Sequence, residues 1–214
     1  MQFDKNAIEN LESRYRAALI NSVSGFKPAN LIGTASPQGE TNLAVMSSVV
    51  HLGSHPPLLA MVVRPGGDER HTLANLLASG EYTINHINSD IYRQAHQTAA
   101  RYPAKVSEFT ATGLHEQWLK GFSAPFVAQA EVKMAMQLRQ HMPLEINGTH
   151  LVIGEIIHLE LPGNAVRRDG SLNLPAAGTV AVSGLDEYLT AAALARLSYA
   201  KPDLPLREIS EESE

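Results

Sequence analysis

The residues best suited to chemistry gather where a turn meets a predicted helix, in the stretch RPGGDERHTLAN. Arg70 and His71 stand directly before Thr72, the predicted N-cap, although the positive end of a helix dipole repels cations. An anion among them would relieve this conflict, because the first turn of a helix also offers unpaired N–H donors that bind phosphate. Asp68 and Glu69 could instead neutralise the cations on a solvated turn. The stretch alone leaves both interpretations open.

A second candidate is the strand-like run TNLAVMSSVVHL, in which Ser47 and Ser48 place two small hydroxyl side chains next to each other. Such a run lets backbone donors and acceptors come close to a flat polar ligand. The alternative is an ordinary half-buried strand whose serines hydrogen-bond to their own backbone. This run by itself does not decide between the two.

Other common catalytic and metal-binding patterns are missing from the sequence. There is no cysteine, which excludes thiolate catalysis, cysteine-type zinc sites and disulfides. Among the nine histidines, His51 and His55 lie four apart, but two prolines follow His55 and a helix is not expected there. The sequence contains no H-E-x-x-H, G-x-S-x-G or G-x-G-x-x-G motif. We therefore expect no metal site, hydrolase elbow or Rossmann nucleotide site.

Composition narrows the class of protein further. The 214 residues carry a net charge of −5, so the basic surface that nucleic-acid binding requires is not expected. Apolar residues make up 44% and charged residues only 18% of the chain, so we expect a partner to cover part of the surface, most simply in a homodimer. No apolar run could span a membrane, and the first residues do not form an apolar leader. We therefore expect a cytoplasmic protein with no membrane partner.

The elements that must position these residues are mainly strands joined by short turns. Strands are predicted at 30–36, 42–51, 58–63, 82–87, 125–138 and 150–161, and helices at 4–22, 72–79, 90–101 and 186–197. Gly154, in the middle of the last strand, predicts a bulge or a close approach of the backbone to a neighbour. A doubly wound parallel sheet needs a helix after each strand. The pattern therefore favours an antiparallel barrel or sandwich with helical additions.

The order of these segments resembles the flavin reductase-like family of FMN-binding split barrels. The resemblance covers residues 28–202 and rests on NLIGTASPQGETNLA, SSVVHLGSHPPLL, RHTLAN, GEYTINHI, EFTATGL, APFVAQAEV, THLVIGEI and YAKP, in that order. It implies a mainly β fold, a six-stranded antiparallel split barrel with helical additions at both ends, which forms a homodimer and holds FMN near the dimer interface. We expect one domain, 1–214, with an N-terminal helix in 1–24, the barrel core in 25–161 and a C-terminal extension in 162–214.

The resemblance also implies which residues bind the cofactor. The segment from Asn42 to Val49 would run along the flavin, Arg64 and the RHTLAN stretch would bind the phosphate, and Phe126 could pack near the ring. The implied FMN-binding residues are Asn42, Ala44, Val45, Met46, Ser47, Ser48, Val49, Arg64, Arg70, His71, Thr72 and Asn75. No separate catalytic residue is expected, because the flavin itself would carry the hydride chemistry.

The implied function is an FMN-dependent oxidoreductase that passes hydride from NADH or NADPH to FMN and on to a flavin or another small-molecule acceptor. Reductases of this family often carry a histidine five residues before the glycine of the late strand. This chain has Thr149 there, with His150 one position later, and a shift of one residue moves a side chain to the other face of a strand. The alternatives are a non-catalytic flavin-binding or electron-carrier protein and a pyridoxamine phosphate oxidase-like enzyme.

Overall fold

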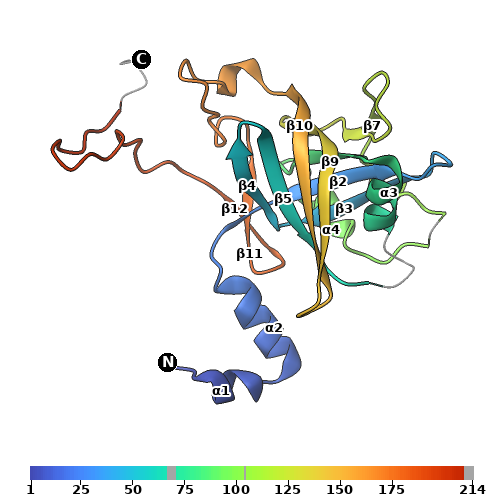
Figure 1. Cartoon of the computed structure of the whole chain (residues 1–214), viewed down its shortest axis with the longest axis horizontal. Helices are drawn as coiled ribbons and strands as arrows, with labels where there is room; N and C mark the ends of the chain where they lie inside the picture. The colour runs from blue at the N-terminus through green and yellow to red at the C-terminus, as the bar shows by residue number, and fades with distance from the viewer. Residues whose placement is uncertain (67–70, 104, 210–214) are drawn as a thin grey trace.

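The computed structural model describes residues 1–66, 71–103 and 105–209 of the chain. The main strands are β2 (Asn30–Ala35), β3 (Thr41–Met46), β4 (Val49–Ser54), β5 (Pro57–Val63), β6 (Glu81–His86), β9 (Lys133–Leu144) and β10 (Thr149–Glu160). They form one antiparallel sheet in the order β3-β2-β6-β9-β10-β5-β4 (Figure 1). The predicted mainly β, antiparallel fold is confirmed, but the predicted number of six strands is wrong, since this sheet has seven.

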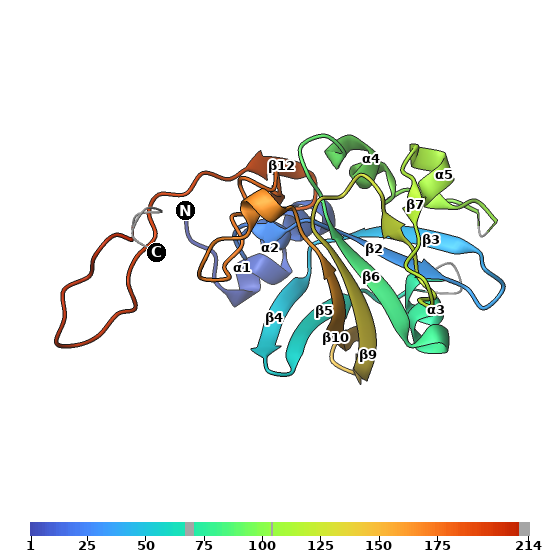
Figure 2. The same cartoon turned by 90° about the horizontal axis from the view of Figure 1, so that it is seen from above.

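The seventh strand arises from a break in the run predicted as one strand at 42–51. β3 ends at Met46 and β4 begins at Val49, yet the two strands lie at opposite edges of the sheet. Because only Ser47 and Ser48 join them, the sheet curls until its two edges approach at this point (Figure 2). In the described residues β3 and β4 do not pair with each other, so the barrel is split along this seam.

Two smaller sheets and several short helices complete the fold. β1 (Lys27–Pro28), β11 (Val180–Ser183) and β12 (Glu187–Thr190) form a three-stranded sheet, and β7 (Glu116–Gln117) pairs with β8 (Phe126–Val127). The helical segments in the described residues are α1 (Lys5–Glu9), α2 (Ser13–Ser22), α3 (His71–Ser79), α4 (Tyr92–Gln97), α5 (Glu108–Thr112) and a 3-10 turn at Gly163–Ala165. Over the same residues, no helix is both long and apolar enough to cross a membrane.

The helix predicted at 4–22 is two helices. Asp4 caps α1 by accepting a hydrogen bond from the Ala7 N–H at 2.7 Å. Glu12 then caps α2 by accepting one from the Tyr15 N–H at 2.9 Å. This second cap satisfies a backbone donor that a continuous helix would bond internally, so a new helix begins there.

The helix predicted at 186–197 is wrong. Residues Glu187–Thr190 form β12, which pairs with β11 around a turn where Gly184 has a φ of +58°. The spacing of Leu189 and Leu197 favoured a helix, whereas the alternation of VAVS followed by a glycine turn indicates a hairpin. After β12 the chain continues as an extended arm that projects from the body (Figures 1 and 2).

The strand predicted at 125–138 is interrupted. β8 ends at Val127, a turn follows, and β9 begins only at Lys133. The Asn85 side chain accepts a hydrogen bond from the Val127 N–H at 2.9 Å, so the turn is fixed from a neighbouring strand. The buried apolar residues of this turn alternate with polar residues, as they would in a strand. In the structure they pack the turn into the core.

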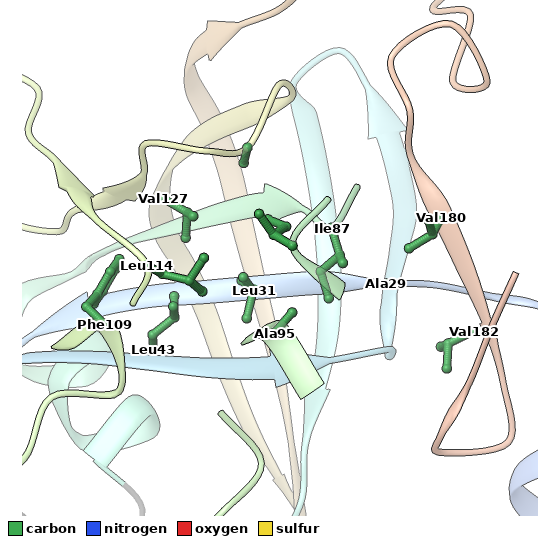
Figure 3. Close-up of a cluster of buried hydrophobic side chains, with 12 residues drawn as sticks. Ala29, Leu31, Leu43, Ile87, Ala95, Phe109, Leu114, Val127, Val180 and Val182 are labelled. Carbon is green, nitrogen blue, oxygen red and sulfur yellow. The ribbon is translucent and has the colours of Figure 1, made fainter. Parts of the chain in front are cut away.

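β2 is buried on both faces and therefore separates two hydrophobic cores. Leu31 packs with Leu43 and Phe109 in the cluster between β2, β3 and the helices α4 and α5 (Figure 3). Ile32 belongs to the second cluster, inside the curled sheet, together with Met61. Successive strand residues point to opposite faces, which explains why every residue of this strand is buried, including the polar Asn30 and Thr34.

Gly154 shows the close approach that its position in the strand predicted. β10 shifts its register against β9 between Ile153 and Gly154. A Cβ atom at Gly154 would lie 2.1 Å from the hydroxyl oxygen of Tyr82, which is buried in the curled sheet. Burial raises the pKa of this tyrosine, so the hydroxyl stays neutral. The prediction of a bulge or close approach is confirmed.

Candidate cofactor-binding cleft

A cleft of about 910 Å³ opens between β3, the link from β3 to β4, the start of α3 and the small β1-β11-β12 sheet. Its volume lies near the upper end of the range of about 300–1,000 Å³ that is usual for ligand sites. Nine of the twelve predicted cofactor-binding residues line it, namely Asn42, Ala44, Val45, Met46, Ser47, Ser48, Arg64, His71 and Thr72. The fold therefore brings the two candidate stretches of the sequence to one place.

The remaining predicted residues lie elsewhere. Val49 is part of the core inside the curled sheet. Asn75 is buried and donates from Nδ2 to Thr34 Oγ1 at 3.2 Å, so it fixes α3 to β2 instead of facing the cleft. Phe126 is fully buried beside Phe122, with ring centroids 6.4 Å apart, and it does not line the cleft either. Arg70 lies outside the described residues.

The start of α3 is tied to β3 by a contact between an amide and a hydroxyl group. Asn42 Nδ2 donates to Thr72 Oγ1 at 2.9 Å, and both side chains are buried. Because the threonine oxygen is the acceptor in this contact, its own proton is left for another acceptor. The first turn of α3 thus adds an oriented hydroxyl donor to its unpaired N–H groups.

Basic side chains gather on the same cleft. Lys27, Arg64 and His71 all line it. Asn21, in the last turn of α2, holds the first two: Arg64 Nη2 donates to Asn21 Oδ1 at 3.2 Å, and Lys27 Nζ donates to the Asn21 carbonyl oxygen at 2.9 Å. Burial, and after it the charge of Arg64, lowers the pKa of Lys27. A cleft with these groups in an acidic protein favours an anionic ligand.

β3 is an edge strand whose outward N–H groups are occupied by side chains. The Leu43 N–H donates to Glu108 Oε2 at 2.9 Å, and the Val45 N–H donates to Thr98 Oγ1 at 3.0 Å. These bonds occupy an edge that could otherwise pair with another strand. They also fix α5 and the chain after α4 beside the cleft, which keeps β3 in place as one of its walls.

The late-strand histidine does not face the cleft. His150 Nδ1 lies 2.9 Å from His141 Nε2, and the two rings are stacked with centroids 5.0 Å apart. Thr149 Oγ1 donates to Asn147 Oδ1 at 2.7 Å. Neither Thr149 nor His150 is among the described residues that line the cleft. The described residues also contain no group of three side chains that could hold a metal ion.

Sequence reasoning missed several residues of the cleft. Lys27 precedes the motifs that carry the family resemblance, and Tyr188 falls within the helix that was wrongly predicted. Both line the cleft because β1 and β12 pair with β11. Strand pairing between such distant segments leaves no local signal in a single sequence. Only the hairpin alternation around Gly184 could have indicated part of this wall.

Comparison with known proteins agrees with this geometry. Residues 24–175 match the flavin reductase like domain, so the chain belongs to the flavin reductase-like family, as the order of its motifs predicted. Its structure is similar to that of a candidate flavin reductase with a split barrel domain from Shewanella frigidimarina. The two chains are 54% identical, the TM-score is 0.91, and the match covers 94% of this chain and 100% of that one.

More distant structures share the fold. Component B of nitrilotriacetate monooxygenase from Bacillus cereus matches with a TM-score of 0.81 and 19% identity, over 92% of this chain and 98% of that one. The flavoredoxin of Desulfovibrio vulgaris matches with a TM-score of 0.68 and 20% identity, over 83% and 91% respectively. At these identities the similarity establishes the split-barrel fold alone.

Proposed function

We propose that the protein binds FMN in this cleft and acts as an FMN-dependent oxidoreductase. The observation that carries the proposal is that β3, the Ser47–Ser48 link and the start of α3 meet on one cleft. The donors at the start of α3 fit a phosphate, because they combine first-turn N–H groups, the Thr72 hydroxyl and the basic side chains of Arg64 and His71. Bound FMN would supply the hydride chemistry.

The chain's own contribution is to bind and orient the cofactor. Asn42 holds the Thr72 oxygen, so the hydroxyl proton points to an acceptor other than the amide. Ser48 Oγ donates to the Val62 carbonyl oxygen at 2.7 Å, which fixes the link between the two edges of the sheet. The same hydroxyl oxygen can still accept a hydrogen bond from a ligand N–H. These residues would hold the flavin along the seam of the split barrel.

NADH or NADPH is the proposed hydride donor, and a flavin or another small molecule is the proposed acceptor. The FMN-loaded protein can be mixed anaerobically with each nucleotide in a stopped-flow instrument while the flavin absorbance is followed. We expect at least one nucleotide to bleach the flavin rapidly and saturably. A flavin that stays oxidised with both nucleotides would rule out the reductase activity.

A flavin-binding electron carrier is the second candidate function. It is favoured by the position of His150, which contacts His141 and does not line the cleft, and by the similarity of the fold to a flavoredoxin. A carrier would bind FMN but show no nicotinamide turnover in the stopped-flow experiment. A pyridoxamine phosphate oxidase-like activity would instead appear as oxygen consumption with pyridoxine 5′-phosphate.

We further propose that a second copy of the chain covers the outer face of β4 and β5. Val50 on β4 pairs directly with Ala60 on β5, and Val62 lies two residues further along β5, so Val50 and Val62 share one face, where they are 56% and 37% exposed. An exposed apolar face marks an interaction site, and a twofold dimer pairs such a face with itself. Val62 also lines the cleft, so the partner would lie beside the cofactor.

We expect sedimentation equilibrium at micromolar concentration to give twice the mass of one chain. Val50→Glu would place a charge on the face that the second copy would cover, and this variant should sediment as a monomer. Ile146→Glu is the matched control, because Ile146 is fully exposed in the turn between β9 and β10. A wild-type protein that sediments only as a monomer would contradict the proposed dimer.

A further inference from the structure

The arm that follows β12, residues 191–209, projects from the body and folds back on itself (Figures 1 and 2). The Ser198 N–H donates to the Arg207 carbonyl oxygen at 2.9 Å, and the Arg207 N–H donates to Ser198 Oγ at 3.1 Å. At the root of the arm, Arg196 forms an ion pair with Asp169, in the loop between β10 and β11. The arm therefore has a defined shape and is attached to the body at its root.

Large apolar side chains of the arm are exposed to solvent. Those that are more than half exposed are Leu194, Leu197, Tyr199, Leu204 and Leu206. A two-stranded hairpin is at best marginally stable in water by itself, and apolar side chains gathered on one exposed segment mark an interaction site. A surface that covers the arm would explain why a segment of this composition keeps a defined shape.

The charges of the arm indicate what kind of surface this is. Its charged residues nearly balance, namely Arg196, Lys201 and Arg207 against Asp203 and Glu208. Nucleic acids and anionic membrane surfaces attract clusters of basic residues, and the arm has no such cluster. A segment with balanced charges and exposed leucines is suited to a protein surface instead.

The place of the arm indicates that this protein surface belongs to a second copy of the chain. Both views show the arm beyond β4, at the end of the molecule opposite α3 (Figures 1 and 2). In the described residues β4 pairs only with β5, and Val50 and Val62 are exposed on the outer face of these two strands. A second copy on this face would lie on the same side of the molecule as the arm. Between Thr190 and the turn at Pro202, the chain can span up to about 40 Å, which is enough to pass from one copy to the other.

We propose that the arm packs onto a second copy of the chain, so that each copy of a twofold dimer clasps the other with its arm. The inference rests on the proposed dimer and goes beyond it, because the arm would supply a contact separate from the face of β4 and β5. In a twofold dimer every such contact occurs twice. Pro202 and Pro205 restrict the backbone at the tip of the arm, which reduces the entropy lost when the arm docks.

Photo-crosslinking of the full chain tests which surface the arm contacts. With Tyr199 replaced by p-benzoylphenylalanine, a cross-link between copies gives a covalent dimer on a denaturing gel, whereas a cross-link within one chain leaves the mass unchanged. We expect the covalent dimer. Trp118, replaced in the same way, is the matched control and should give none. It is half exposed and directly follows β7, which lies at the end of the molecule opposite the arm (Figure 1).

Sedimentation equilibrium then measures whether the arm stabilises the dimer. Leu204→Glu and Leu206→Glu should each raise the dissociation constant of the dimer about tenfold or more, because each removes an apolar contact that occurs twice. Both side chains are exposed in the single chain, so neither change affects the core. Ile146→Glu is again the control and should leave the dissociation constant unchanged.

The outcomes separate the arm from the proposed dimer. If the wild type is a dimer but position 199 gives no covalent dimer, or if both leucine variants dimerise as tightly as the wild type, the clasp is refuted and the contact through β4 and β5 stands. A wild type that sediments only as a monomer refutes both proposals. Neither experiment involves the flavin, so these results are independent of whether FMN binds in the cleft.

Discussion

Replacing Gly33 by alanine is expected to lower the free energy of unfolding by about 3 kcal/mol or more. An alanine Cβ would lie 2.3 Å from the Pro125 carbonyl oxygen and 2.5 Å from Thr83 Oγ1. Those two atoms are joined by a buried hydrogen bond of 2.7 Å, which anchors the chain before β8 to β6. Because the nearest atom belongs to the backbone, this steric clash can be relieved only if β2 or the chain before β8 moves.

Urea denaturation measures this effect directly. Gly163→Ala is the matched control, because a Cβ there would meet nothing within 4 Å and the backbone is not in the left-handed region. Its free energy of unfolding should stay within about 0.5 kcal/mol of the wild type, as for most surface substitutions. If Gly33→Ala were equally harmless, the close packing of β2 against residue 125 would be disproved.

Sequence patterns located the short, regular elements well. The continuous apolar run of β5 and the run rich in isoleucine, valine and leucine in β10 are local features, so each strand lies within a residue or two of its predicted bounds. The helix α3 was also predicted, because a turn rich in glycine precedes an apolar pattern of helical period. Its start was misplaced slightly, since Thr72 was predicted as the N-cap but lies inside the helix, which begins at His71. These elements depend mainly on residues within themselves, which is why one sequence is sufficient to find them.

The features that could not be predicted from the sequence depend on contacts between segments that are far apart in the chain. Nothing local distinguishes Ser47 and Ser48 within a strand from the same residues in a link between two sheet edges. Asn75 lies one helical turn from Thr72 and therefore shares its face of α3, yet it contacts β2 and not the cleft. The role of Lys27 depends on the pairing of β1 with β11, which periodicity does not reveal.

The cleft itself was predictable to the extent that its residues belong to the recognised motifs. The order of the motifs matched both the Ser47–Ser48 stretch and the start of α3 to the same protein family. The fold brings these two segments together at the cleft. The motifs did not reveal that additions at both ends of the chain build the opposite wall. The family resemblance thus located the side of the cleft formed by β3 and the start of α3, whereas the wall carrying Tyr188 required the three-dimensional structure.

Thr72→Val is expected to weaken FMN binding about tenfold to a hundredfold. Valine keeps the shape of threonine but removes the hydroxyl donor that would meet the phosphate. It also removes the acceptor of the Asn42 amide at 2.9 Å, whose other contact, to Thr34 Oγ1, is longer at 3.4 Å. Quenching of FMN fluorescence on titration with the apo-protein gives the dissociation constant, and thermal unfolding checks that the variant is folded.

Two further variants decide what a weakened affinity means. Thr72→Ser keeps the hydroxyl and should bind FMN within about threefold of the wild type, because both the donor and the acceptor are preserved. Thr149→Val removes a hydroxyl that donates to Asn147 in the turn before β10, away from the residues that line the cleft, and should leave the dissociation constant unchanged. If Thr72→Val folds normally and binds FMN as tightly as Thr72→Ser, the phosphate does not meet the start of α3.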